Sequence, residues 1–187
     1  MSTLEVNTID SVSGTSNLTI GSGNSSQITL KSGATLTNFP DMTPAFMVYK
    51  GSGTNQTISN NTYTKVEFSV EDVDTDNNFD SNKFTPTTAG KYFLFASVAC
   101  DCSSSNFSAG NIQIRKNGSE LYESTNQQTN NPANHINIEV QAIVDANGTS
   151  DYFEIFVEIQ DTSGSPVINA GGGARRSRFM GFKVLGA

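Results

Sequence analysis

The sequence contains no tryptophan, one histidine, two cysteines and five prolines among its 187 residues. One histidine and two cysteines leave few side chains for nucleophilic catalysis or for a zinc site, which takes about four ligands. The 18 acidic residues outnumber the 11 basic ones and give a net charge of −7, which argues against nucleic acid as a partner. No apolar run approaches the ~20 residues that a membrane-spanning helix needs. We therefore expect neither nucleic-acid binding, nor membrane insertion, nor enzymatic activity.

Short polar side chains are abundant instead. The chain has 23 Ser, 20 Thr and 20 Asn, and these residues compete with the helical backbone for hydrogen bonds, which argues against a helical bundle. Only 16% of the residues are charged, and 12 Phe and 5 Tyr occur among β-branched residues, unlike the composition of a disordered polyelectrolyte. The composition predicts a strand-rich protein with one hydrophobic core.

The composition changes near residue 42. Residues 1–42 contain one aromatic residue, Phe39, and the other 16 follow it. Short apolar alternations separated by Gly and Ser recur in this segment, at Leu4-x-Val6, Leu18-x-Ile20, Ile28-x-Leu30 and Ala34-x-Leu36. They predict a β-rich stalk at 1–42 that completes its core with neighbouring chains, followed by a globular knob at 43–187. A flexible polar leader is the alternative. The first residues lack the features of a signal peptide, so we expect synthesis and retention in a cytoplasm.

The knob shows the pattern of an all-β sandwich. Two Asn-Gly pairs, Asn117-Gly118 and Asn147-Gly148, lie between alternating runs and predict hairpin turns, because both central residues of such turns need a positive φ. Many short strands without a helix are typical of a sandwich or jelly roll. We predict nine strands, at residues 45–49, 63–68, 83–86, 91–99, 112–115, 121–124, 136–144, 152–159 and 178–184.

Three motifs of the knob occur in the order found in one known family. They are Phe79-Asp80, the segment Phe84-x-Pro86-x-x-x-Gly90-x-Tyr92, and the closing strand Phe179-Met180-Gly181-Phe182. Over residues 44–187 the chain resembles the C1q-like domain. The resemblance implies a C1q/TNF-like jelly roll of ten strands that assembles as a compact homotrimer.

The N-terminal segment resembles a second group of proteins. Residues 4–9 followed by Leu18-Thr19-Ile20 look like the start of tail-fibre and appendage proteins of bacteriophages. This resemblance implies a structural virion protein, made in the host cytoplasm and docked on other virion proteins through residues 1–42. Its knob would lie on the virion surface, where it would adsorb to a host glycan or receptor or decorate the capsid. The alternatives are a secreted or surface C1q- or lectin-like binding module and, third, a polysaccharide depolymerase, which would need paired carboxylates.

The trimer contact is the first candidate site. Residues 91–99 are apolar on both faces, as expected for a strand between its own sheet and a trimer axis. Phe156 lies on the polar face of its strand, beside Glu154 and Glu158, and a subunit contact would explain it; so would a loop folded over the sheet. The predicted trimer core is Phe93, Phe95, Phe156 and Phe182.

Ligand and metal sites are the remaining candidates. Polar loops rich in Asn and the basic segment before the last strand predict ligand contacts at Asn106, Asn130, Asn131, His135, Arg175 and Arg176. The spacing of Asp72, Asp74 and Asp76 resembles the start of a calcium loop, but the glycine and the closing glutamate of an EF-hand are missing, so a solvated acidic loop is the alternative. Cys100 and Cys102 are expected to be reduced, with proximity between subunits as the alternative.

Overall fold

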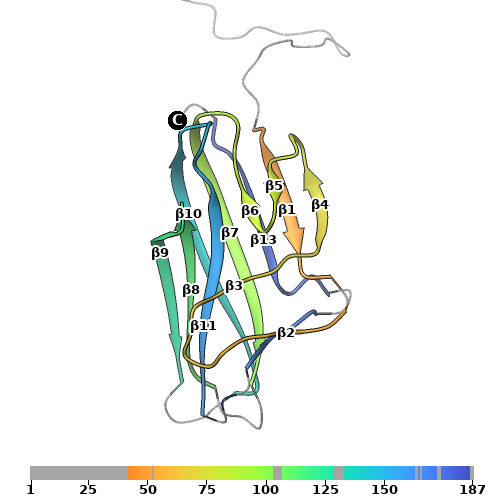
Figure 1. The fold of residues 1–187 in the computed structure, drawn as a ribbon, viewed down its shortest axis with the longest axis vertical. Helices are drawn as coiled ribbons and strands as arrows, with labels where there is room; N and C mark the ends of the chain where they lie inside the picture. The colour runs from red at the N-terminus through yellow and green to blue at the C-terminus, as the bar shows by residue number, and fades with distance from the viewer. Residues whose placement is uncertain are drawn as a thin grey trace, which may run out of the picture. The chain divides into compact units, whose positions relative to one another are not determined.

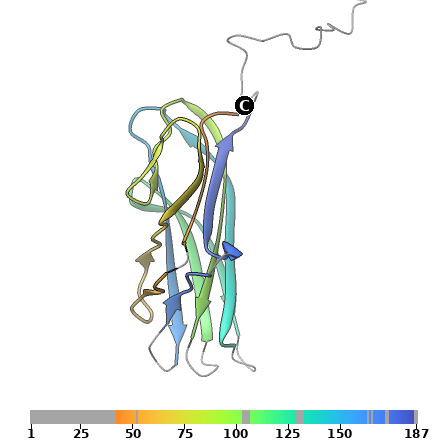
Figure 2. The same cartoon turned by 90° about the vertical axis from the view of Figure 1, so that its right-hand side faces the viewer.

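The computed structural model describes residues 42–51, 53–102, 107–128, 133–162, 164, 166–171 and 174–185. These residues form two antiparallel β-sheets that face each other and enclose one core (Figure 1). The long strands run along the long dimension of the sandwich, and loops join them at its two ends (Figure 2). No helix in the described part of the chain is long and apolar enough to cross a membrane.

The first sheet, sheet A, is built around strand β7 (Gly90–Asp101). The full length of β7 pairs with β10 (His135–Ala146) on one side. On its other side, β7 pairs with β13 (Arg178–Lys183) and with the short β12 (Val167–Ile168). The sheet is completed by β1 (Ala45–Tyr49), β4 (Val70–Asp74) and β2 (Gln56–Thr57), in the order β2-β12-β7-β13-β1-β4.

The second sheet, sheet B, has strand β11 (Phe153–Asp161) at its centre. It pairs along its length with β8 (Phe107–Lys116), which in turn pairs with the edge strand β9 (Ser119–Gln127). The other side of the sheet holds β3 (Thr64–Lys65), β6 (Lys83–Phe84) and β5 (Phe79–Asp80).

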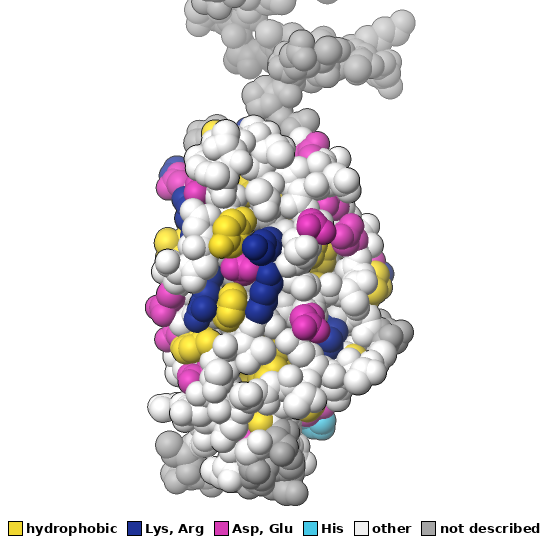
Figure 3. Space-filling view, in the orientation of Figure 1, with side chains coloured by type: hydrophobic (Ala, Val, Ile, Leu, Met, Phe, Trp, Pro, Cys, Tyr) yellow, Lys and Arg dark blue, Asp and Glu magenta, His cyan; other side chains and the backbone are white. Residues whose placement is uncertain are grey.

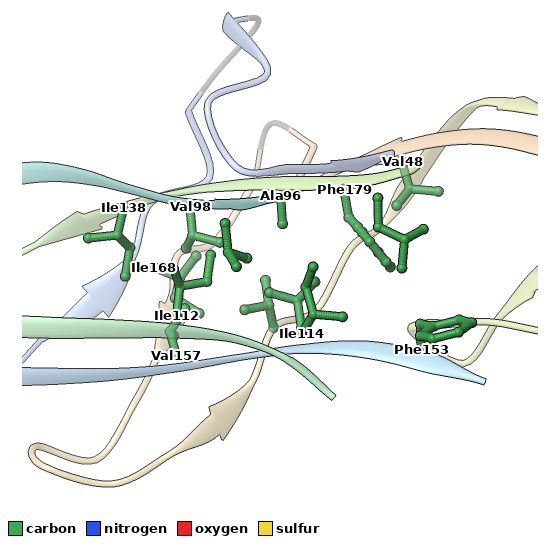
Figure 4. Close-up of a cluster of buried hydrophobic side chains, with 14 of the residues drawn as sticks. Val48, Ala96, Val98, Ile112, Ile114, Ile138, Phe153, Val157, Ile168 and Phe179 are labelled. Atoms are coloured by element: carbon green, nitrogen blue, oxygen red, sulfur yellow. The ribbon is translucent and has the colours of Figure 1, made fainter. Parts of the chain in front are cut away.

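The core lies between the sheets and follows from alternation along the strands. Every second residue of β7 from Tyr92 to Cys100 is fully buried, and these side chains face Ile112, Ile114 and Val157 of sheet B. Figure 4 shows Val98 and Ile138 pointing from one sheet toward Ile112 and Val157 on the other. Residues that alternate with this set lie on the outer faces, so the period-two pattern divides the side chains of each strand between two faces.

The predicted all-β sandwich is confirmed, with corrections to individual strands. The range 45–49 is correct, and the other long strands are found with ends shifted by a few residues. Strands β2, β4, β5 and β12 were not predicted, and the acidic run expected to form a loop begins inside β4. The predicted strand 63–68 shrinks to β3, because Phe68 donates its backbone N–H to the side chain of Asn82 instead of to a neighbouring strand.

Both predicted Asn-Gly segments contact one buried carboxylate, that of Asp151, but only Asn117-Gly118 forms a hairpin turn. Asn147-Gly148 joins β10 of sheet A to β11 of sheet B, and only its Gly148 has a positive φ, so the predicted hairpin there is wrong. Asn117 and Gly118 have φ values of 54° and 82°, as the hairpin turn between β8 and β9 requires. The Asn117 amide donates to Oδ1 of Asp151 at 2.9 Å, and the backbone N–H of Asn147 donates to Oδ2 at 2.9 Å. Lys116 lies 2.9 Å from the same carboxylate. The hydrogen bond with Lys116, followed by that with Asn117, lowers the pKa of Asp151 below its ordinary value of 3.8.

We expect Asp151→Ala to lower the free energy of unfolding by about 2 kcal/mol at neutral pH, because it removes three charge-assisted hydrogen bonds. The folded-state pKa is the lower one, so this stabilisation is complete well above pH 3.8 and is lost as the pH falls through the folded-state value. Urea unfolding as a function of pH measures it. Asp145→Ala is the control: Asp145 is exposed and pairs with Lys91, so its loss should cost under about 0.5 kcal/mol. Equal losses for the two variants would contradict the prediction.

Candidate functional site

The outer face of sheet A carries rows of apolar side chains that cross four strands. One row runs from Ala45 through Phe182 and Phe93 to Ile143. The next runs through Val73, Met47, Met180 and Phe95, and the polar Gln141 lies beyond Phe95 on β10. The rings of Phe93 and Phe182 lie 5.5 Å apart. We call these two rows the apolar face.

The apolar face is open to solvent in the single chain. Ile143 is 56% exposed and Val73 45% exposed, while Phe93, Phe95 and Phe182 are half-buried. Three of the four residues predicted for the trimer core therefore lie together on this face. Sequence analysis missed Met47, Met180 and Ile143, because alternation assigns them to a face but does not identify the neighbouring strands.

Phe156 does not lie with the other three. It belongs to β11 and points from the outer face of sheet B, on the opposite side of the sandwich. The guanidinium of Arg115 covers its ring at 3.9 Å, and also lies 5.3 Å from the ring of Tyr63. Figure 3 shows Lys and Arg side chains beside apolar ones over the middle of one face of the sandwich. Because a cation over an aromatic ring is a favourable contact, Phe156 has a partner within its own chain.

A second candidate site is a group of polar side chains at one end of the outer face of sheet A. His135 opens β10 opposite Asp101 on β7, and its Nδ1 lies 2.5 Å from Oδ1 of Asp101. The Asn169 amide donates to the other oxygen of Asp101. Beside this chain of contacts is a hollow of about 320 Å³, lined by Ala99, Cys100, Asp101, His135, Ile136, Asn137 and Arg176. The structure thus brings together two predicted ligand residues, His135 and Arg176.

The other predicted ligand residues are not part of this hollow as described. Asn106, Asn130 and Asn131 lie outside the described residues. Arg175 is next to Arg176 in sequence but pairs with Asp72 at 3.1 Å and lies 5.0 Å from the ring of Tyr49. Sequence analysis missed Asp101, Asn137 and Asn169, because polar residues spaced along three segments carry no local motif.

The three predicted calcium ligands each have a separate partner. Asp72 pairs with Arg175, and Asp74 accepts hydrogen bonds from the backbone N–H groups of Asn78 and Phe79 at 3.0 and 2.9 Å. Asp76 accepts from the Thr75 hydroxyl at 3.0 Å. Among the described residues no three Asp, Glu, His or Cys side chains converge as a metal site requires. In this arrangement Asp74 fixes the turn after β4.

Both cysteines are free thiols in the interior. Cys100 is fully buried and faces the core, so that it does not lie on a surface where subunits could meet. Burial raises the pKa of Cys100 strongly, and burial together with the nearby Asp161 raises that of Cys102 to about 12. Because thiolates are the reactive and metal-binding form, these side chains act as small core residues.

Comparison with known proteins bears on the fold. No family model and no curated protein matches the sequence. Among solved structures, the globular domain of zebrafish complement 1qA protein aligns with a TM-score of 0.52 and 14% identity, over 75% of this chain and 96% of that domain. Murine APRIL aligns with a TM-score of 0.54 and 7% identity, over 75% and 98% of the two chains. Eiger TNF from S. frugiperda gives 0.54 and 9%, over 76% and 93%.

These likenesses agree with the topology described above, in which two antiparallel sheets enclose one core and β7 and β11 lie at their centres. They concern the fold and do not bear on the predicted role of residues 1–42. The chain has the C1q/TNF-like jelly-roll fold.

Proposed function

We propose that this chain is a non-enzymatic binding module that works as a homotrimer, with the apolar face of sheet A as the subunit contact. The observation that carries the proposal is the pair of apolar rows that include Phe93, Phe95, Phe182, Met180 and Ile143. Contiguous apolar surface of this kind is uncommon on a monomer and marks a contact with another protein.

A second copy of the chain is the occupant that fits best. The rows lie on a sheet whose inner side already faces the core, so covering the outer side would bury both faces of β7, as its sequence pattern suggests. The resemblance to C1q-like domains also implies a trimer. Three copies held together would bring three equivalent ligand surfaces to one target, which raises apparent affinity by avidity.

The oligomeric mass tests this proposal directly. We expect native mass spectrometry and sedimentation of the full chain at micromolar concentration to give three times the 20.0 kDa chain mass. A monomer at that concentration would overturn the proposal. Incubation with candidate polysaccharides should release no sugar fragments, whereas measurable release would favour a depolymerase.

A virion role is a second hypothesis, and it rests on the sequence pattern of residues 1–42 alone. In that case this segment would dock the trimer on other virion proteins, and the knob would lie on the particle surface. Electron microscopy of purified particles with an antibody against the knob tests it. Label on the particles would support the hypothesis, and its consistent absence would reject the virion location while leaving the trimeric binding module intact.

A further inference from the structure

The hollow at the polar end of sheet A contains Arg176, which forms no ion pair with a described carboxylate. Both oxygens of Asp101 are engaged, one by His135 and the other by Asn169. The side chain of Arg176 is exposed. A planar guanidinium of this kind binds a carboxylate through two parallel hydrogen bonds.

The contact with Asp101 also determines which ring nitrogen of His135 carries the hydrogen. A carboxylate accepts hydrogen bonds only, so Nδ1 of His135 carries the hydrogen that it shares with Asp101. In the neutral ring, Nε2 is then an acceptor and does not bind an anion. When the ring gains a proton, Nε2 becomes a second charged donor, and histidines change charge in the range of about pH 5 to 8.

The charged groups that face His135 are few. Among the described residues they are Asp101 on β7 and Arg176 in the segment before β13, and the next outward-facing charge on β10 is Glu139. The segments outside the described residues nearest in sequence, 103–106 and 129–132, contain no ionisable side chain.

The remaining lining suits a sugar ring. Asn137 donates its amide to the Ser97 hydroxyl at 3.0 Å, so its carbonyl oxygen is the atom that can accept from a ligand hydroxyl. Ala99 contributes apolar surface. A volume of about 320 Å³ is near the lower end of small-ligand pockets, which suits a mono- or disaccharide.

We propose that this hollow binds the carboxylate of an acidic sugar, with Arg176 as its main contact, and that protonation of His135 strengthens the binding. This rests on the proposed function as a binding module and names its ligand class. The site is complete within one chain, so that it does not depend on trimer formation.

The single histidine of the chain makes the test direct, since one NMR signal, that of its Hε1 proton, reports on the site. We would titrate the full chain with galacturonate and follow this signal and the heat of binding at about pH 7.5 and about pH 5.5. We expect binding about fivefold to tenfold tighter at the lower pH, since a charged donor is added.

Variants of the chain and other ligands show whether galacturonate binds specifically at this hollow. Arg176→Gln should abolish the effect of galacturonate, whereas Lys91→Gln, which removes one positive charge at the opposite end of β7, should leave it unchanged. His135→Gln should bind with equal affinity at both pH values. The proposal is overturned if galacturonate leaves the histidine signal unchanged, if galactose or inorganic phosphate has an equal effect, or if Arg176→Gln binds as well as the unaltered chain. A trimeric mass with no such binding would reject this site but not the proposed assembly.

Discussion

Phe93→Glu is expected to convert the proposed trimer to monomers at micromolar concentration. Phe93 lies in the first apolar row, between Phe182 and Ile143, so a carboxylate there would be buried without a partner in the contact between subunits. We expect each subunit contact to lose about 3 kcal/mol or more, roughly a hundredfold in its equilibrium constant. Because Phe93 is half-buried in the single chain, the monomer itself should lose only about 1 kcal/mol. Sedimentation velocity and thermal unfolding measure the two effects separately.

Phe156→Glu provides a matched control on the opposite sheet. Its ring is also half-buried, but it lies under Arg115, and a carboxylate there would meet a cation. This variant should remain trimeric. Dissociation by Phe156→Glu with a stable trimer in Phe93→Glu would move the contact to sheet B. Dissociation by both variants would mean that the contact involves both faces, as the sequence analysis supposed for Phe156.

Gly181→Ala is expected to destabilise the fold itself. Gly181 faces the core from β13, and an added Cβ would lie 2.5 Å from the Leu94 side chain and 2.8 Å from the backbone oxygen of Phe93. A third close contact, at 2.9 Å, would be with the ring of Phe46. Leu94 can shift, but the backbone of a central strand cannot without disturbing its ladder. We expect a loss of about 2 kcal/mol or more, or roughly 4–8 °C in Tm.

Gly53→Ala is the control for Gly181→Ala. It measures the general effect of replacing glycine by alanine where the added Cβ has no close neighbour. Gly53 is exposed and has no atom within 4 Å of an added Cβ. Gly53→Ala should leave stability unchanged or raise it slightly, by up to about 1 kcal/mol, because the unfolded chain becomes less flexible. If Gly181→Ala unfolds at the same temperature as Gly53→Ala, the close packing at Gly181 is not required.

Alternation carried most of the information about the fold. In residues 152–159 it separated the face with Phe156 and the two glutamates from the face that is buried, because successive residues of a strand point to opposite faces. Residues 91–99 are apolar on both faces, so alternation there did not identify the core face. The Asn117-Gly118 hairpin turn was also predicted, since its backbone conformation depends on the residues in the turn. Asn147-Gly148 was wrongly predicted as a hairpin, because the sequence does not show that β10 and β11 belong to different sheets. Strands of two residues, such as β2 and β12, were missed because they depend on pairing with distant segments and not on their own sequence.

The surfaces were only partly predictable. The sequence pointed to Phe93, Phe95 and Phe182 as contact residues and to His135 and Arg176 as ligand residues. It also placed Phe156 in the same contact, although alternation gives a face only relative to its own strand. Which sheet that strand joins is set by pairing, and β11 pairs with β8 in sheet B.

By itself the sequence determined the all-β class, the division of each long strand into two faces, and the scarcity of reactive groups, because these depend on composition and on a two-residue period. Only the tertiary structure decided that Phe156 lies under Arg115, that Asp74 supports a turn, and that one hollow is lined by His135, Arg176 and Asp101, the last of which is hydrogen-bonded to Asn169. Those contacts join distant segments: the hydrogen-bonded residues Asp101 and Asn169, for example, are 68 positions apart. Strand order and register bring such segments together, and no local sequence pattern specifies them.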